Sequence, residues 1–224
     1  MNHLADLAAG DFSKWMHSTQ QARVDQTAVD VACGECSACC TSSYVIHVGA
    51  EEARSLARIS EEMAFPVDTT PPRALMMAAD PQGCCPMLSD GRCSIYDARP
   101  LICRQYDCRM FAAAGIADVG GDGKALITEQ VRRWQFDYAA PQDVRRHAAI
   151  RMAAIFLRLH ASEFPSGLIP PEPTQLATVA LRLGARFLEF IDGNGEARGQ
   201  PVASELVQEL ARFLVRDVDG QEIW

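Results

Sequence analysis

Cysteine is the residue type whose number and spacing point most clearly to chemistry in this chain. Nine cysteines fall into two groups, four within eight residues and five further downstream, and the chain beyond residue 108 has none. The groups are Cys33, Cys36, Cys39 and Cys40, then Cys84, Cys85, Cys93, Cys103 and Cys108. Because thiolates bind zinc and iron–sulfur clusters, this segregation predicts a metal or iron–sulfur site.

The first group has a three-residue period, and a Cys-x2-Cys unit lets a tight turn bring two sulfurs to one metal. It departs from the ferredoxin run Cys-x2-Cys-x2-Cys-x3-Cys-Pro because Cys40 follows Cys39 directly. Adjacent side chains generally diverge, so these two thiols are expected to differ in role. One serves a first site, and the other a second site, a bridge or the core.

The second group supplies the remaining ligands. Asp90-Gly91 is typical of a two-residue hairpin turn, so a hairpin over 85–93 is expected to bring Cys85 near Cys93. Cys103 follows in a predicted helix. Cys108 lies five residues later and, on a regular helix, points about 140° away from Cys103. Cys84 is adjacent to Cys85, and adjacent side chains generally diverge. Spacing alone therefore ranks Cys108 and Cys84 lowest as ligands.

Composition narrows the function classes. The chain has 224 residues, a net charge of −8 and 48% hydrophobic residues. Phosphate binding needs a basic surface, so we expect no nucleic-acid partner. The start of the chain lacks the pattern of a secretory signal, and no apolar run approaches the ~18 residues of a membrane span. We therefore expect no membrane partner and a cytoplasmic protein, whose reduced thiols favour metal ligation over disulfides.

Hydrophobic periodicity and turn residues predict the elements that position these thiols. Along the N-terminal half we expect a helix over 11–29, a strand over 44–48, a helix over 50–63, a loop over 65–72, the hairpin over 85–93 and a helix over 96–110 with Asp97 as N-cap. Apolar stripes predict helices beyond residue 140, and their members are Val144, Ala148, Met152, Ile155 and Leu159; Leu176, Val179, Ala180, Leu183, Phe187 and Ile191; and Leu206, Leu210, Phe213 and Leu214.

A glycine-rich stretch over 115–124 marks the expected boundary between two domains. Residues 1–119 are predicted to form a cysteine-cluster metal-binding domain with its core at 33–108, and residues 120–224 a helical C-terminal region. The predicted fold class is mainly α (α+β), with a metal-centred, cysteine-rich N-terminal half that contains a short β-hairpin, and a helical C-terminal half.

The two cysteine groups and the residues around them form one extended sequence pattern: Cys33-x2-Cys36-x2-Cys39-Cys40, Cys85-Pro-x-Leu, Gly91-Arg-Cys93-Ser-Ile-Tyr96 and Arg99-Pro100-Leu-Ile-Cys103-Arg104. This pattern resembles the YkgJ-like CxxCxxCC family of zinc- or iron-chelating cysteine-cluster proteins. The resemblance implies that Cys33, Cys36, Cys39, Cys40, Cys85, Cys93 and Cys103 are metal ligands. Cys108 fits a less regular extension of the pattern and completes the set of candidate metal ligands, while Cys84 is additional.

Two arginines flank Cys103. Four thiolates around a divalent ion carry about −2 charge, so Arg99 and Arg104 are candidate cofactor-binding residues that offset this charge and donate hydrogen bonds to sulfur. The alternative is an ordinary salt bridge to Asp97, Asp107 or Glu35. His47 is a candidate nitrogen ligand or, alternatively, a plain polar or core histidine on a strand.

The leading function is metal binding through cysteine thiolates in a cytoplasmic, bacterial-type protein, with zinc or an iron–sulfur cluster as cofactor and 4Fe-4S as one candidate cluster type. One alternative is an iron–sulfur-dependent enzyme, either an oxidoreductase or a methyltransferase-like protein, because a related cysteine pattern occurs in flagellin lysine N-methylases. Another is a structural zinc module that contacts a protein partner. Metal delivery through Cys84 and Cys108 is a third. Six arginines give the predicted C-terminal helices a local positive charge, which indicates either a solvated helix face or a binding site for an anionic partner. They are Arg132, Arg133, Arg145, Arg146, Arg151 and Arg158.

Overall fold

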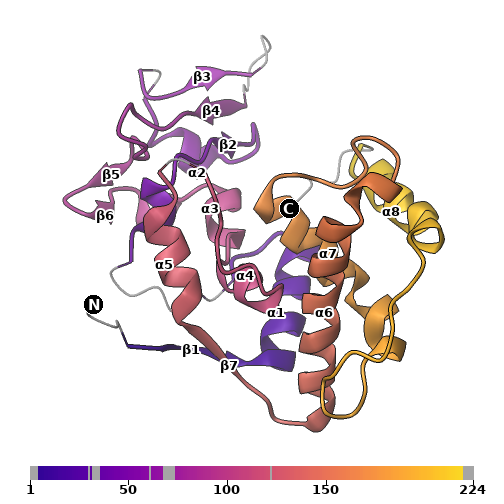
Figure 1. Ribbon diagram of the computed structural model, residues 1–224. Helices are drawn as coiled ribbons and strands as arrows, with labels where there is room; N and C mark the ends of the chain where they lie inside the picture. The colour runs from indigo at the N-terminus through magenta and orange to yellow at the C-terminus, as the bar shows by residue number, and fades with distance from the viewer. Residues whose placement is uncertain are drawn as a thin grey trace. The chain divides into compact units, whose positions relative to one another are not determined.

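The computed structural model describes residues 5–29, 31, 36–60, 62–67, 74–121 and 123–218, with the side chains of residues 23 and 212–218 excepted (Figure 1). Helices dominate and the strands are short, which confirms the predicted mainly α (α+β) class. The chain forms two compact units. The helical unit is Met1–Ser13, Arg109–Val119 and Val131–Trp224, and the cysteine unit is Lys14–Cys108 and Gly120–Gln130. The predicted division into domains at 119/120 stays a prediction.

The cysteine unit contains a small antiparallel sheet and several short helical segments. Its sheet has β4 (Leu75–Met77) between β2 (Ile46–Val48) and β3 (Phe65–Pro66), as Figure 1 shows. Buried beside the sheet is a core cluster of Val48, Ile59, Ala64, Met77, Met87 and Ile95. The side chains of Cys85 and Cys93 pack against this cluster, so the hydrophobic core itself supports two of the predicted ligands.

Three predicted elements of this unit have different bounds. The helix expected over 11–29 is α1 (Phe12–Val24), which ends before a turn where Gln26 has a φ of 54°. The helix expected over 50–63 is the single turn α2 (Ala53–Leu56), because the chain leaves the helix to bury Ile59 and Ala64 in the core cluster. The predicted loop begins with β3, and its residues 68–72 lie outside the described part of the chain.

The helix predicted over 96–110 is wrong as one element. The chain forms η2 (Tyr96–Ala98), α3 (Leu101–Gln105) and α4 (Arg109–Ala113) instead. Pro100 disfavours helical backbone at Arg99, whose ψ is 141°, and Pro100 rather than Asp97 precedes α3 as its N-cap. Because α3 ends at Gln105, the angle expected between Cys103 and Cys108 on one regular helix does not apply.

The hairpin prediction is confirmed. Strands β5 (Leu88–Ser89) and β6 (Arg92–Cys93) pair antiparallel, with Leu88 opposite Cys93. Asp90 and Gly91 between them have φ angles of 50° and 75°. Positive φ at both central residues is the requirement of a type I′ turn, which Asp-Gly satisfies at low cost.

The helical unit contains a two-stranded parallel sheet, β1 (Leu7–Asp11) beside β7 (Trp134–Asp137), and the unit's longer helices. These helices are α6 (Pro141–Leu159), α7 (Pro173–Phe187) and α8 (Ala203–Val218), joined through η3 (Ala161–Glu163) and η4 (Leu188–Phe190). Helix α5 (Ala125–Arg133) contributes its first residues to the cysteine unit and its last residues to the helical unit. Helices α6 and α7 pack side by side (Figure 1). A Cβ on Gly184 would lie 2.4 Å from Cγ1 of Ile150, so glycine permits this close approach.

The apolar stripe predicted for α7 is confirmed, because all its members, from Leu176 to Ile191, are buried. On α8, Leu206 and Leu210 are buried as expected, and the side chains of Phe213 and Leu214 lie outside the described residues. The stripe predicted for α6 is wrong, since Ile155 and Leu159 are 54% and 75% exposed.

Two buried polar residues explain the orientation of α6. The hydroxyl of Ser13 donates to the carboxylate of Asp143, and the Tyr138 hydroxyl lies 2.6 Å from Nδ1 of His147. The His147 ring also stacks on Phe12, with ring centroids 4.8 Å apart. These contacts direct the Asp143–His147 face inward, and the face that carries Ile155 and Leu159 therefore points to solvent.

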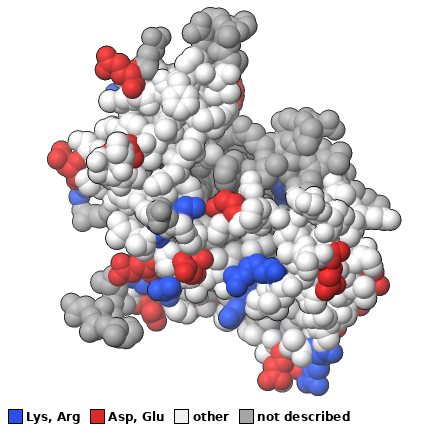
Figure 2. All heavy atoms as spheres, turned by 45° about the horizontal axis from the view of Figure 1, so that its top comes forward, with Lys and Arg blue, Asp and Glu red and all other residues white. Residues whose placement is uncertain are grey.

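Several of the C-terminal arginines bond to backbone carbonyls. Arg132 donates to Ala117, Arg133 donates to Ala5, and Arg145 donates to the carbonyls of Leu188 and Ile191. On the face drawn in Figure 2, basic and acidic side chains lie among one another. No helix in the described ranges is both long enough and apolar enough to span a bilayer.

Candidate metal centre

The first cysteine group lies on a tight turn. Helix η1 (Ala38–Thr41) is one turn of 3-10 helix, in which the Cys40 N–H donates to the Ser37 carbonyl at 2.8 Å. This turn leaves Cys39 exposed and Cys40 half-buried. Cys36, which precedes the turn, is also half-buried, and Cys33 lies outside the described residues.

Main-chain hydrogen bonds join this turn to the second cysteine group. The Cys85 N–H donates to the Cys40 carbonyl at 2.7 Å, and the Ser43 N–H donates to the Gly83 carbonyl at 3.0 Å. The Asp80 carboxylate accepts the N–H of Cys84 at 2.8 Å and so fixes the loop that leads into Cys85. Backbone hydrogen bonds therefore join two segments that are far apart in sequence.

The hairpin holds its two thiols in matching environments. Burial raises the pKa of Cys85, and the backbone N–H of Met87 acts in the opposite direction. Burial likewise raises the pKa of Cys93, and the backbone N–H of Ile95 opposes it. In both cases the donor lies two residues beyond the cysteine, so each sulfur has a backbone dipole that stabilises its thiolate form.

Four thiols share one electrostatic environment. Burial raises the pKa of Cys103, as do the charges of Cys85, Cys40 and Cys93, while Arg99 lowers it. The charge of Cys40 also raises the pKa of Cys85 and of Cys93. Such coupling requires proximity, so η1, the hairpin and α3 bring these four sulfurs together. We call Cys40, Cys85, Cys93 and Cys103 the four-thiol cluster.

Thiols that oppose one another's ionisation keep their protons until a cation replaces them, which is how metal binding and thiol deprotonation are coupled. Four thiolates are the full ligand set of a structural zinc ion or of a 4Fe-4S cluster, so the donor chemistry fits either group. Within the described ranges, no three Cys, His, Asp or Glu side chains are arranged to hold an ion directly. The sulfurs would therefore have to move closer together around a metal.

Cys39 and Cys108 lie beside a pair of tyrosines. The hydroxyls of Tyr44 and Tyr106 are 3.0 Å apart, and burial, the neighbouring Tyr44, and then Cys108 and Cys39 raise the pKa of Tyr106. Cys108 is only 7% exposed. A hydrogen bond with the Cys39 side chain is the main cause of the raised pKa of Cys40, so Cys39 links this pair to the four-thiol cluster.

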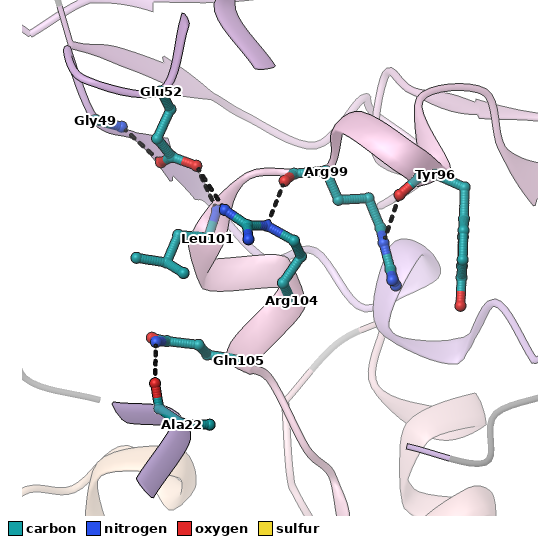
Figure 3. Close-up of polar contacts among 8 residues, drawn as sticks. All are labelled: Ala22, Gly49, Glu52, Tyr96, Arg99, Leu101, Arg104 and Gln105. Atoms are coloured by element: carbon teal, nitrogen blue, oxygen red, sulfur yellow. Dashed lines mark hydrogen bonds and ion pairs between the residues drawn. The ribbon is translucent and has the colours of Figure 1, made fainter. Parts of the chain in front are cut away.

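The two predicted arginines have different surroundings, which Figure 3 shows. Arg99 donates from Nε to the Tyr96 carbonyl at 2.9 Å, and its Cζ lies 3.7 Å from the Tyr96 ring centroid. Its charge lowers the pKa of Cys40, Cys93 and Cys103. Arg99 therefore acts as a counter-charge for the cluster.

Arg104 contacts two neighbouring segments of the protein, although its side chain is 36% exposed. Its Nε donates to the Arg99 carbonyl at 3.0 Å, and its Nη2 lies 3.8 Å from Glu52 Oε2 (Figure 3). Glu52 was not among the three salt-bridge partners expected for Arg104. Asp107, which was, accepts a hydrogen bond from Trp15 Nε1 at 2.7 Å. His47, the candidate nitrogen ligand, lies on β2 opposite Met76.

Glu52 and the backbone donors at Met87 and Ile95 were not found from the sequence. The glutamate lies 49 residues before its partner Leu101, and the N–H donors carry no side-chain signal. The signal that could have indicated the Met87 and Ile95 donors is a cysteine at the start of a turn, because the N–H two residues later can then point back at the sulfur.

Comparison with protein-family models places part of the chain in a known family of domains. Residues 32–124 match the CxxCxxCC family, described as a "putative zinc- or iron-chelating domain". No curated protein and no solved structure matches the chain. The matched range contains every residue of the four-thiol cluster, together with Arg99 and Glu52.

Proposed function

We propose that this chain, whose residues 32–124 match the CxxCxxCC zinc- or iron-chelating domain, binds a metal through the thiolates of Cys40, Cys85, Cys93 and Cys103. The observation that carries the proposal is the mutual coupling of these four thiols, which come from three separate segments. Thiols that acted only as small apolar side chains would have no reason to gather from three separate segments.

We propose zinc as the primary occupant. A closed structural zinc site takes four ligands in a tetrahedron, and the four-thiol cluster supplies that number. Four thiolates and Zn²⁺ carry about −2 charge, which Arg99 partly offsets. Because the ligands come from η1, the hairpin and α3, the ion would join these segments, and its binding free energy would add to the stability of the cysteine unit.

A second candidate is a 4Fe-4S cluster or a second metal ion, and the exposed Cys39 favours it. Cys39 is a fifth thiol, hydrogen-bonded to the candidate ligand Cys40. A tetrahedral zinc site is complete with four ligands, whereas a cluster or a two-metal site can use additional thiolates. Cys33, Cys36, Cys39 and Cys108 are then the remaining candidate ligands. None of the eight described cysteines forms a disulfide, which fits a reducing compartment such as the cytoplasm.

The test is anaerobic purification of the full chain, followed by elemental analysis and a visible spectrum. The proposal predicts a colourless protein with about one equivalent of zinc, the number a four-thiolate site holds. A brown protein that contains iron and is bleached by dithionite would support the cluster instead. A correctly folded protein that contains neither metal, and takes up neither when they are supplied, would contradict both.

A further inference from the structure

One carboxylate, that of Glu52, accepts two backbone hydrogen bonds and pairs with an arginine near Cys103. Glu52 Oε1 accepts the Gly49 N–H at 2.9 Å, and Oε2 accepts the Leu101 N–H and lies 3.8 Å from Arg104 Nη2. The Glu52 side chain is only 11% exposed, and Figure 3 shows it between the loop after β2 and the start of α3. Burial of the charged carboxylate has an unfavourable desolvation free energy, which the two N–H donors and the nearby Arg104 guanidinium offset.

Two paths lead from Glu52 to the cluster. Leu101 is the first residue of α3, and Cys103 is the third, so the bond to the Leu101 N–H fixes the helical turn that carries this thiol. Arg104 donates to the carbonyl of Arg99, the residue whose charge lowers the pKa of three cluster thiols. Glu52 thus anchors both one sulfur and the counter-charge.

Resting on the metal-binding function proposed above, we infer that Glu52 is a positioning residue of the metal centre. It acts through Leu101 and Arg104 rather than as a ligand, because both of its oxygens already accept donors. By holding Cys103 and Arg99 in place before the metal arrives, it raises the affinity of the site. This positioning role requires a carboxylate. In a glutamine, one of the two accepting oxygens would be replaced by an NH₂ group, which cannot accept a hydrogen bond from the Gly49 or the Leu101 N–H.

The experiment is a Co²⁺ titration of the metal-free full chain, read by the thiolate-to-cobalt charge-transfer absorption. Glu52→Gln is compared with Glu51→Gln, which makes the same chemical change at the neighbouring exposed position. We expect Glu52→Gln to weaken Co²⁺ binding about 10- to 100-fold, the usual effect of removing a residue that orients ligands. The spectrum at saturation should match that of the wild type, because all thiolates are retained. Glu51→Gln should bind like the wild type.

Equal affinity of the two variants would overturn the inference, as would a saturated Glu52→Gln spectrum that indicates the loss of an oxygen ligand. If Glu52→Gln does not fold, as judged by circular dichroism, Glu52→Asp takes its place, since the shorter side chain keeps the charge but cannot reach both the Gly49 and the Leu101 N–H. Wild-type affinity in that variant would then overturn the inference.

A second readout separates this inference from the proposed function. In metal-free protein, the rate at which iodoacetamide alkylates Cys103 is measured by peptide mass spectrometry. Loss of the bond to the Leu101 N–H should increase that rate several-fold in Glu52→Gln relative to Glu51→Gln, because the start of α3 opens more often. If the wild type binds no Co²⁺, the proposed function fails, while faster alkylation still supports positioning. Equal alkylation rates contradict positioning.

Discussion

The backbone N–H of Cys85 donates a 2.7 Å hydrogen bond to the carbonyl of Cys40. This bond joins two cysteines that lie 45 residues apart in sequence, and it involves only their main-chain atoms. Replacing a thiol by a hydroxyl leaves the bond in place. Loss of metal in a Cys→Ser variant can therefore be interpreted as the loss of a ligand rather than of the scaffold.

The first prediction concerns ligand identity. Cys93→Ser removes one thiol of the four-thiol cluster and should lower the metal affinity at least tenfold, since even changes beyond the ligands cost about that much. Cys84→Ser is the matched control, because the charge of Cys84 raises the pKa of its neighbour Cys85 but does not act on Cys93 or Cys103. Metal content after dialysis against a competing chelator measures the difference. Full occupancy of Cys93→Ser would remove Cys93 from the ligand set.

The second prediction concerns the counter-charge. Arg99 lowers the pKa of Cys40, Cys93 and Cys103, so Arg99→Gln should raise the pKa of these thiols. Protons then compete better with the metal, and the pH at which half the protein binds Co²⁺ should increase by roughly half a unit to one unit. The exposed Arg58→Gln provides the control for loss of one positive charge. Superimposable pH profiles for the two variants would disprove this role.

The third prediction concerns the helical unit. Burial lowers the pKa of His147 to about 4, so at neutral pH the ring is neutral, with Tyr138 donating to Nδ1. In the unfolded chain the same ring takes up a proton near its ordinary pKa of ~6.5. The stabilisation is thus complete above about pH 6.5 and decreases as the pH falls toward 4, by about 3 kcal/mol.

This dependence is measured by urea unfolding between pH 7 and pH 4. His147→Gln lacks the titrating group, so its unfolding free energy should change less over this range than that of the wild type. Identical pH dependence in the two proteins would show that His147 is not kept neutral by the fold.

Features encoded locally could be predicted from the sequence. Asp90-Gly91 specifies its turn by backbone conformation alone, and the spacing of the cysteines indicates a shared thiolate site. The long helix expected over 96–110 failed because Pro100 and the extended Arg99 interrupt it, a local signal that the apolar pattern outweighed.

Features that depend on distant partners could not be predicted. The inward face of α6 follows from Ser13 bonding to Asp143, 130 residues away, and the position of α3 from Glu52 bonding to Leu101, 49 residues away. The different roles of Arg99 and Arg104 have the same origin, since each is decided by where one tertiary partner lies. Hydrophobic periodicity contains no information about such pairs.

The fourth prediction tests the hairpin. Gly91 has a φ of 75°, so Gly91→Ala should lower the free energy of unfolding of the cysteine unit by about 1 kcal/mol. Asp90→Asn should be nearly neutral, since asparagine also tolerates positive φ. Thermal unfolding of the metal-free protein compares them. Equal stability of both variants would mean that the turn does not form as described.

X-ray absorption at the metal edge of the loaded protein tests the central claim most directly. Convergence of Cys40, Cys85, Cys93 and Cys103 on one zinc ion predicts about four sulfur neighbours at about 2.3 Å, and about three sulfurs in Cys93→Ser. A first shell made of oxygen and nitrogen, or an unchanged sulfur count in that variant, would contradict it.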